Sequence, residues 1–171
     1  MVAVLDRDST TSSDDYRLLR LFYEVAFLDS RRRAGMELDI TDEDRLNTLL
    51  TLTSGDPGWT RRRFRRRQMM TPATVKGPDG VCRATILNMS PDGMLLRTDL
   101  DLEVGDAVLV KTGVPGTTQH SFPCQVVRAE DGHAAVTLNG IPLEVRYGSY
   151  RPRRERGRVL RPLGLGIRRI A

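Results

Sequence analysis

Apolar residues recur at three- and four-residue spacing after Asp14, a pattern that places them along one face of a helix. The helix is expected to end before Gly35. A second helix is expected to start at Thr41, an N-cap candidate with Asp44 in the reciprocal position, and to stop before Ser54. Residues 14–55 are therefore predicted to form a helical hairpin with one apolar face. In the first helix this face consists of Leu18, Leu21, Phe22, Val25, Ala26 and Leu28.

This hairpin is too small to be stable alone, because two short helices bury little apolar surface. It must pack on the rest of the chain or on another protein. We interpret residues 14–53 as an interaction element for a protein partner, with packing on the following domain as the alternative.

The period of the pattern changes to two after residue 68. In residues 81–87 the side chains of Cys82, Ala84 and Ile86 share one face of a strand, while Arg83 and Thr85 occupy the other. Six short strands without helical crossovers predict a mainly β fold. We expect a six-stranded antiparallel barrel over residues 69–148, preceded by the helical hairpin. The other five strands are predicted at 74–76, 94–98, 107–111, 122–128 and 134–138, between turns rich in Gly, Pro and Asp.

The net charge of +5 is distributed unevenly along the chain. Residues 1–60 carry 7 basic and 12 acidic side chains, residues 61–150 carry 12 and 9, and residues 151–171 carry 8 and 1. The basic character therefore comes largely from the tail and says little about what the folded part binds. Residues 1–13, rich in Ser and Thr, and the basic tail at 149–171 are both expected to be disordered.

The sequence offers no recognisable catalytic or metal site. Cys82 and Cys124 have no CxxC spacing and no neighbouring histidine, which is typical of reduced thiols in a cytoplasmic protein. His120 and His133 lie in or beside turns, where a place at the surface is expected. No apolar run is long enough for a transmembrane helix, and the acidic N-terminus does not resemble a secretory signal. We therefore expect a cytoplasmic protein that is not an enzyme, with no catalytic residues, no metal and no cofactor.

Two stretches stand out as candidate binding elements. The first, RRRFRRR at residues 61–67, sets six arginines around Phe64 in a linker over residues 56–68. The second, NMSPDG at residues 88–93, joins two predicted strands and offers short polar side chains that can bond backbone or ligand groups. A solvated charge run and a plain turn would explain each stretch taken alone.

Taken together, the two stretches resemble the PilZ domain, a bacterial receptor module for the second messenger cyclic di-GMP. Arg62-x-x-x-Arg66 resembles the first motif of that family, with Arg61 just ahead of it. The resemblance covers about residues 60–147 and implies a flexible arginine linker that wraps over a β-barrel when the ligand binds. It implies ligand contacts for both motifs, and the second motif is matched at each defined position, by Asn88, Ser90 and Gly93.

The chemistry of the ligand agrees with these residue types. A guanidinium group can pair in bidentate fashion with phosphate oxygens or with the O6 and N7 atoms of guanine, and it can stack on a base. An alternative register pairs Arg63 with Arg67. We prefer Arg62 and Arg66, because Phe64 then occupies a position where the family often has an aromatic residue.

The resemblance thus implies a cyclic di-GMP receptor that relays the signal to an unidentified protein partner, with motility or surface behaviour as the kind of output. The alternative is an adaptor of the same fold that has lost ligand binding and acts through protein–protein contacts. Specific nucleic-acid binding is not expected. A nonspecific attraction of the arginine run and the tail to polyanions is a third interpretation.

Overall fold

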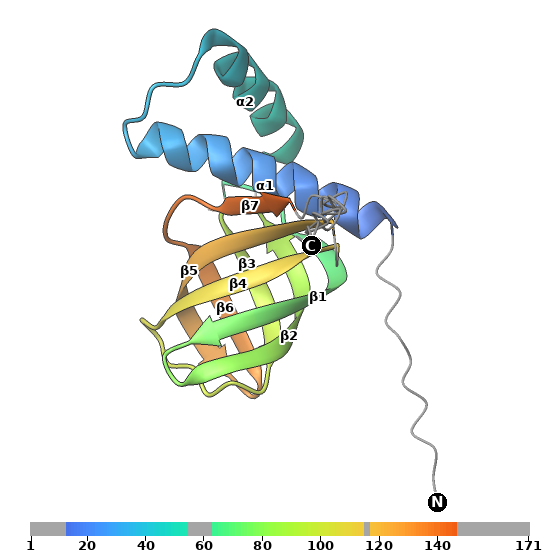
Figure 1. The fold of residues 1–171 in the computed structure, drawn as a ribbon, viewed down its shortest axis with the longest axis vertical. Coiled ribbons are helices and arrows are strands. Elements are labelled where there is room, and N and C mark those ends of the chain that lie inside the picture. Colours follow the sequence, from blue (N-terminus) through green and yellow to red (C-terminus); the bar gives the residue numbers. More distant parts are fainter. Residues whose placement is uncertain (1–12, 55–62, 115–116, 147–171) are drawn as a thin grey trace, which may run out of the picture.

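The computed structural model describes residues 13–54, 63–114 and 117–146. Within these residues lie two helices and seven strands (Figure 1). The predicted disorder of residues 1–13 and 149–171 falls outside this part of the chain, except for Ser13, which begins the first helix. Arg61 and Arg62 of the arginine run also lie outside it.

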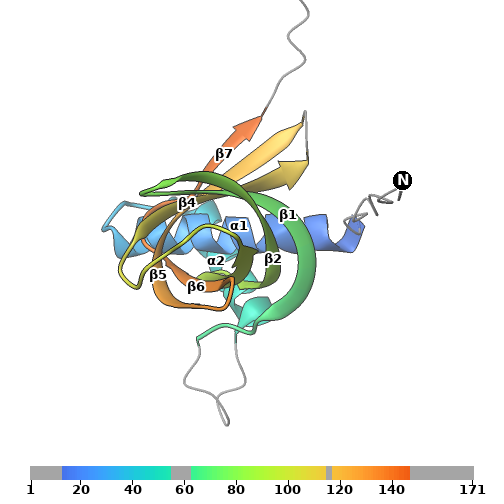
Figure 2. The same cartoon turned by 90° about the horizontal axis from the view of Figure 1, so that it is seen from below.

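Six strands form a closed antiparallel barrel in the order β4-β1-β2-β3-β6-β5, and the pairing of β4 with β5 closes it (Figure 2). The predicted mainly β fold, a six-stranded barrel behind two helices, is thereby confirmed. Each of the six predicted strands lies inside an observed one. The strands are β1 (Arg67–Gly77), β2 (Gly80–Ser90), β3 (Gly93–Thr98), β4 (Ala107–Val114), β5 (Thr118–Glu130), β6 (His133–Leu138) and β7 (Leu143–Arg146).

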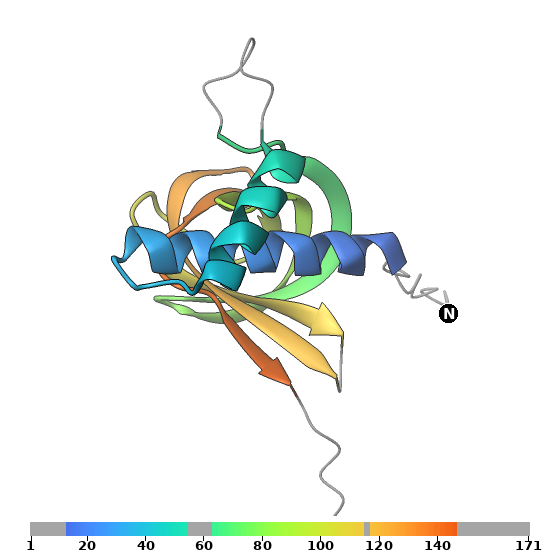
Figure 3. The same ribbon diagram turned by 90° about the horizontal axis from the view of Figure 1, so that it is seen from above.

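The seventh strand, β7, lies outside the barrel wall. It pairs with the residues of β5 from Thr118 to Ser121, and the same residues also pair with β4. The ends of β4 and β5 together with β7 therefore form a wing that projects beside the barrel (Figures 2 and 3). The sequence pattern did not predict β7, because Leu143 and Val145 are exposed and the strand has no buried face.

The barrel interior is filled by alternate residues of each strand, including Val75, Leu96 and Phe122. In β2 this alternation shifts once, because Leu87 is an extra residue between the positions of Ile86 and Asn88 in the pairing with β3. Ile86 and Met89 are consequently both in the core, while Asn88 between them is half-buried and outside the core cluster. The bulge thus leaves one of the expected ligand residues, Asn88, outside the barrel core.

Helix α1 (Ser13–Arg33) lies across one end of the barrel (Figures 1 and 3). Leu19 and Phe22 are 1% and 2% exposed and belong to the same buried cluster as the barrel core. Burial of each such side chain contributes about 1.5–3 kcal/mol. Packing on the following domain, which was the alternative to an interaction element, therefore holds for α1.

Helix α2 (Ile40–Thr53) packs against α1 and buries only Leu46 and Thr53. The predicted N-cap at Thr41 is wrong, because the helix begins one residue earlier, with Asp39 as its cap. The Asp39 carboxylate accepts a hydrogen bond from the backbone N–H of Asp42 at 2.7 Å, and aspartate satisfies such a donor better than threonine does.

The placement of the two histidines differs. His133 is exposed as expected, but His120 is 5% exposed, so its predicted surface position is wrong. The wing brings His120 against Tyr23 of α1, with ring centroids 4.4 Å apart, and no local pattern reveals such a contact. Cys82 and Cys124 are free thiols. Of the helices in the described residues, none is long and apolar enough to cross a membrane.

Candidate ligand-binding site

The turn between β2 and β3 is fixed by its own polar groups. The Ser90 hydroxyl lies 2.6 Å from the Asp92 carboxylate and 3.2 Å from the carbonyl oxygen of Gly93. The Asp92 carbonyl oxygen in turn accepts hydrogen bonds from the backbone N–H of Leu138 at 2.9 Å and the Thr137 hydroxyl at 3.1 Å. Ser90 is only 1% exposed, so its hydroxyl holds the turn in shape and is not a free surface group.

Gly93 is required by close packing of two strands. A Cβ atom at this position would lie 2.5 Å from the carbonyl oxygen of Val136 on β6. No side chain fits at that distance, so glycine allows β3 to pair with β6 directly after the turn. The fold itself therefore requires glycine at this position of the motif, whether or not a ligand binds.

Asn88 is half-buried and stands opposite Gln68 of β1. Its Oδ1 atom is buried and has no hydrogen-bond partner among the described residues. A buried polar atom without a partner costs about 1–3 kcal/mol, and a ligand that donates a hydrogen bond would remove that cost. Asn88 is thus the residue of the turn motif with spare hydrogen-bonding capacity.

The arginine run approaches this turn along β1. The register pairs Arg67 with Met89 and Gln68 with Asn88, and Arg66 directly precedes the first of these pairs. Opposite residues of an antiparallel pair point to the same face. Gln68 therefore shares a face with Asn88, and the exposed Arg66 lies two residues before Gln68, just before β1 begins.

Arg63 is bound to helix α1. Its two terminal nitrogens donate hydrogen bonds to both carboxylate oxygens of Asp29, each at 2.7 Å. The next residue, Phe64, is 2% exposed, forms an isolated β-bridge with Ser54 and lies 4.8 Å from the Arg63 guanidinium. Residues 63 and 64 are consequently anchored, which differs from the flexible linker that the resemblance implied.

Three arginines lie against the Asp29 carboxylate. Besides Arg63, Arg32 lies 3.3 Å and Arg33 2.5 Å from its carboxylate oxygens. Burial would raise the pKa of Asp29, but the hydrogen bond from Arg63 and the charges of Arg33, Arg63 and Arg32 outweigh it and lower the pKa. Asp29 is therefore ionised at neutral pH, and the cluster retains a net charge of about +2.

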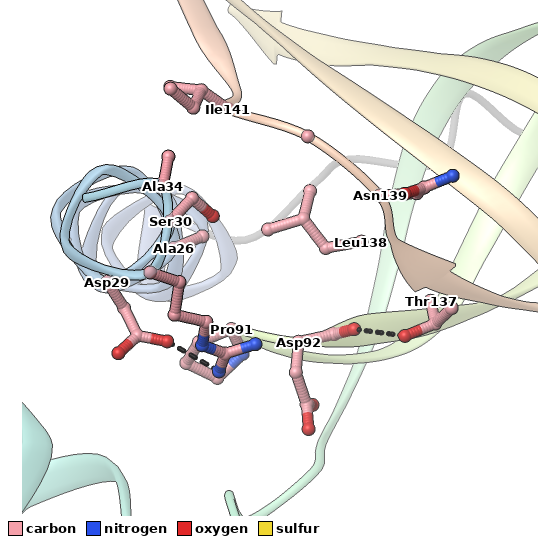
Figure 4. Close-up of a pocket in the computed structure, with 12 residues that line it drawn as sticks. Ala26, Asp29, Ser30, Ala34, Pro91, Asp92, Thr137, Leu138, Asn139 and Ile141 are labelled. Carbon is pink, nitrogen blue, oxygen red and sulfur yellow. Dashed lines mark hydrogen bonds and ion pairs between the residues drawn. The ribbon is translucent and has the colours of Figure 1, made fainter. Parts of the chain in front are cut away.

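A pocket of ≈ 240 Å³ lies between α1 and the β2–β3 turn (Figure 4). Asp29 and Arg33 line it from the helix, and Pro91 and Asp92 line it from the turn. Small-molecule pockets usually measure about 300–1,000 Å³, so this space is too small for a cyclic dinucleotide. It separates the arginine anchor on α1 from the turn that holds Ser90.

The sequence pattern did not reveal Asp29 or Gln68 as neighbours of the candidate site. Asp29 continues the apolar stripe of α1 that includes Phe22 and Val25, where a carboxylate on a buried face requires a partner. An acidic residue at that position was the available signal. Gln68 carried no signal, because its position opposite Asn88 depends on a strand that begins seven residues before the predicted one.

Residues 60–147, more than half of the chain, match the PilZ domain family. The chain belongs to this family. PilZ domains are modules of cyclic di-GMP receptors, which bind ligands or act as adaptors and are not catalytic units. In this PilZ protein the two helices precede the family domain.

Seven chains of known structure also match this PilZ protein. One is the crystal structure of the PilZ domain of CeSA from a cellulose synthesizing bacterium, with 19% sequence identity and a TM-score of 0.39 over 44% of this chain and 80% of that one. A likeness at that level adds nothing to the family assignment, which rests on the sequence match. No curated protein matches the chain.

Proposed function

We propose that this PilZ protein is a bacterial cyclic di-GMP receptor that binds the dinucleotide between its arginine run and the β2–β3 turn. The ligand contacts would come from Arg62 and Arg66, with Arg61 beside them, and from the turn motif of Asn88, Ser90 and Gly93. The bound state would then pass to a protein partner with an output such as motility.

The observation that carries this proposal is that the arginine run leads directly into the part of β1 that pairs with Asn88. Arg66 is exposed and one step from the register that pairs Gln68 with Asn88, and Asn88 has a buried oxygen without a partner in the described residues. A cationic fork next to an open acceptor suits a ligand that combines phosphate oxygens with guanine N–H groups.

Two features favour the Arg62 and Arg66 register over Arg63 and Arg67. Arg63 already donates both of its fork nitrogens to Asp29, so ligand binding through Arg63 would have to break that pair. Arg67 pairs with the core residue Met89 and not with Asn88 or Ser90.

Calorimetric titration of the full chain with cyclic di-GMP tests the proposal. Arg62→Ala and Arg66→Ala should each weaken binding about tenfold or more, because a charge-assisted hydrogen bond contributes about 1.5–3 kcal/mol. Arg97→Ala is the matched control, since it removes an exposed arginine from β3 outside both motifs. Absence of binding by the unmodified protein would refute the proposal, as would equal losses in all three variants.

The alternative function is an adaptor that works without the ligand. It is favoured by α2, where Ile40 and Leu52 are 83% and 67% exposed although they are apolar. An adaptor would bind its partner equally well with and without cyclic di-GMP, and charged substitutions at Ile40 and Leu52 would abolish that contact. Polyanion binding through the arginine run would instead disappear in moderate salt.

A further inference from the structure

A second pocket lies at the other end of α1, lined by the N-terminal half of that helix and by residues of the wing. Its volume is ≈ 500 Å³, within the usual range of small-molecule sites. Arg20 on its rim is nine residues before Asp29, or about 14 Å along the helix axis. The pocket is therefore separate from the arginine run and the turn motif.

The floor of this pocket contains His120, which is 5% exposed. Its Nδ1 atom is buried and has no hydrogen-bond partner among the described residues. The nearest carboxylate oxygen, on Glu144, is 3.7 Å away, too far for a hydrogen bond, and Glu144 is instead bound by Arg146. A buried ring nitrogen that lines a pocket and lacks a partner is suited to a bound molecule.

The pocket rim is positively charged. Arg17, Arg20 and Arg146 line it, and Glu144 is the one acidic residue in the described lining. Arg17 has only a 3.9 Å contact with Asp14, in which both side chains are more than 80% exposed. The Arg17 guanidinium therefore has donors available for an oxyanion.

The protonation state of His120 also suits an anion held by hydrogen bonds. Burial lowers its pKa, the charges of Arg20 and Arg146 lower it further, and among the named charges only Glu144 opposes them. The ring is thus neutral near pH 7, and its Nδ1 atom can donate or accept a hydrogen bond according to the tautomer. The apolar part of a ligand would meet Tyr16 and Leu19 of α1.

We propose that this pocket binds a small organic anion, with the oxyanion group held by Arg17 and Arg20 and a second polar atom bonded to the Nδ1 atom of His120. The inference does not depend on cyclic di-GMP binding, because it uses none of the residues of the proposed receptor site. It would give the protein a second ligand at the opposite end of the same helix.

The chain has two histidines, so their ring signals in an NMR titration report the two positions separately. Adenosine monophosphate serves as a ring-plus-phosphate probe, with inorganic phosphate, citrate and adenosine as the other arms. The His120 signal should shift saturably with adenosine monophosphate, while the exposed His133 stays unchanged. Citrate in place of adenosine monophosphate would identify a carboxylate site, and phosphate alone a site for the head group only.

Two variants with opposite expected effects on binding make the test more specific. Arg20→Gln should weaken binding of the anionic probe about tenfold, and Glu144→Gln should strengthen it by removing the acid from the rim. Arg97→Gln is the control of equal charge change. The inference is overturned if no anionic probe moves His120, if adenosine alone moves it equally, if His133 moves in parallel, or if Arg20→Gln leaves the titration unchanged.

Discussion

Replacement of Asp29 by asparagine tests the anchor between α1 and the arginine run. The carboxylate is 4% exposed and receives two hydrogen bonds from Arg63 at 2.7 Å, besides its contacts with Arg32 and Arg33. Asparagine keeps the shape but has one acceptor oxygen and no charge. The change therefore removes the charge from the pair without opening a cavity.

The expected loss in the free energy of unfolding is about 2–3 kcal/mol. Removal of one partner of a buried pair usually costs about 3–5 kcal/mol, because the other charge is left without compensation. The Arg63 side chain is 41% exposed, so water compensates part of the loss and the effect falls below that range.

Urea unfolding followed by far-UV circular dichroism measures the difference at pH 7. Glu37→Gln is the matched control, because it neutralises an exposed acid between the helices and should change stability by less than about 0.5 kcal/mol. A change of that small size for Asp29→Asn would refute the view that the cluster holds the arginine run on α1.

The difference in the free energy of unfolding between the unmodified protein and Asp29→Asn should also depend on pH. The folded-state pKa of Asp29 is lowered, so its contribution is fully present above the unfolded pKa of about 3.9 and is lost as the pH falls through the folded value. The stability gap between the unmodified protein and Asp29→Asn should therefore shrink on acidification below about pH 4 and stay constant between about pH 5 and 7.

Three further predictions follow from burial. Burial raises the pKa of Cys124 to about 12, so a thiol reagent at pH 8 should modify Cys82 alone in the folded protein and both cysteines in denaturant; rapid modification of both in the folded state would contradict this. Gly93→Ala should lower the free energy of unfolding by about 1–3 kcal/mol, measured in urea, because its Cβ would meet a strand carbonyl at 2.5 Å; unchanged stability would contradict that contact. Phe64→Ala should cost about 3–5 kcal/mol by the same measurement, and a loss below about 1 kcal/mol would show that Phe64 is not packed.

The sequence pattern predicted the barrel because every second residue of its strands points into the core, so that apolar residues recur at that spacing. Val75, Ile86 and Val136 are buried for that reason. The turns between the strands are equally local, since the Asp131–Gly132 pair of the β5–β6 turn adopts positive φ. These parts of the fold require no knowledge of distant contacts.

The remaining features depend on residues far apart in the sequence. Asp29 and Arg63 meet across 34 positions, and Tyr23 covers His120 only because the wing reaches α1. The bulge at Leu87 places Met89 in the core and leaves Asn88 outside it, and a period of two cannot predict where it is interrupted. The residues of the candidate receptor site could therefore be proposed from the sequence, whereas the pairing of Asp29 with Arg63 could not.

Because α1 lies across the end of the barrel, the part of the chain that folds cooperatively is longer than the part that matches the family. The family match begins at residue 60, but Leu19 and Phe22 complete the barrel core from well before that point. A fragment cut at the family boundary would expose that apolar surface to water and leave Arg63 without its carboxylate. Folding of the domain in this protein consequently depends on its helices, and a shortened version is expected to aggregate instead of folding alone.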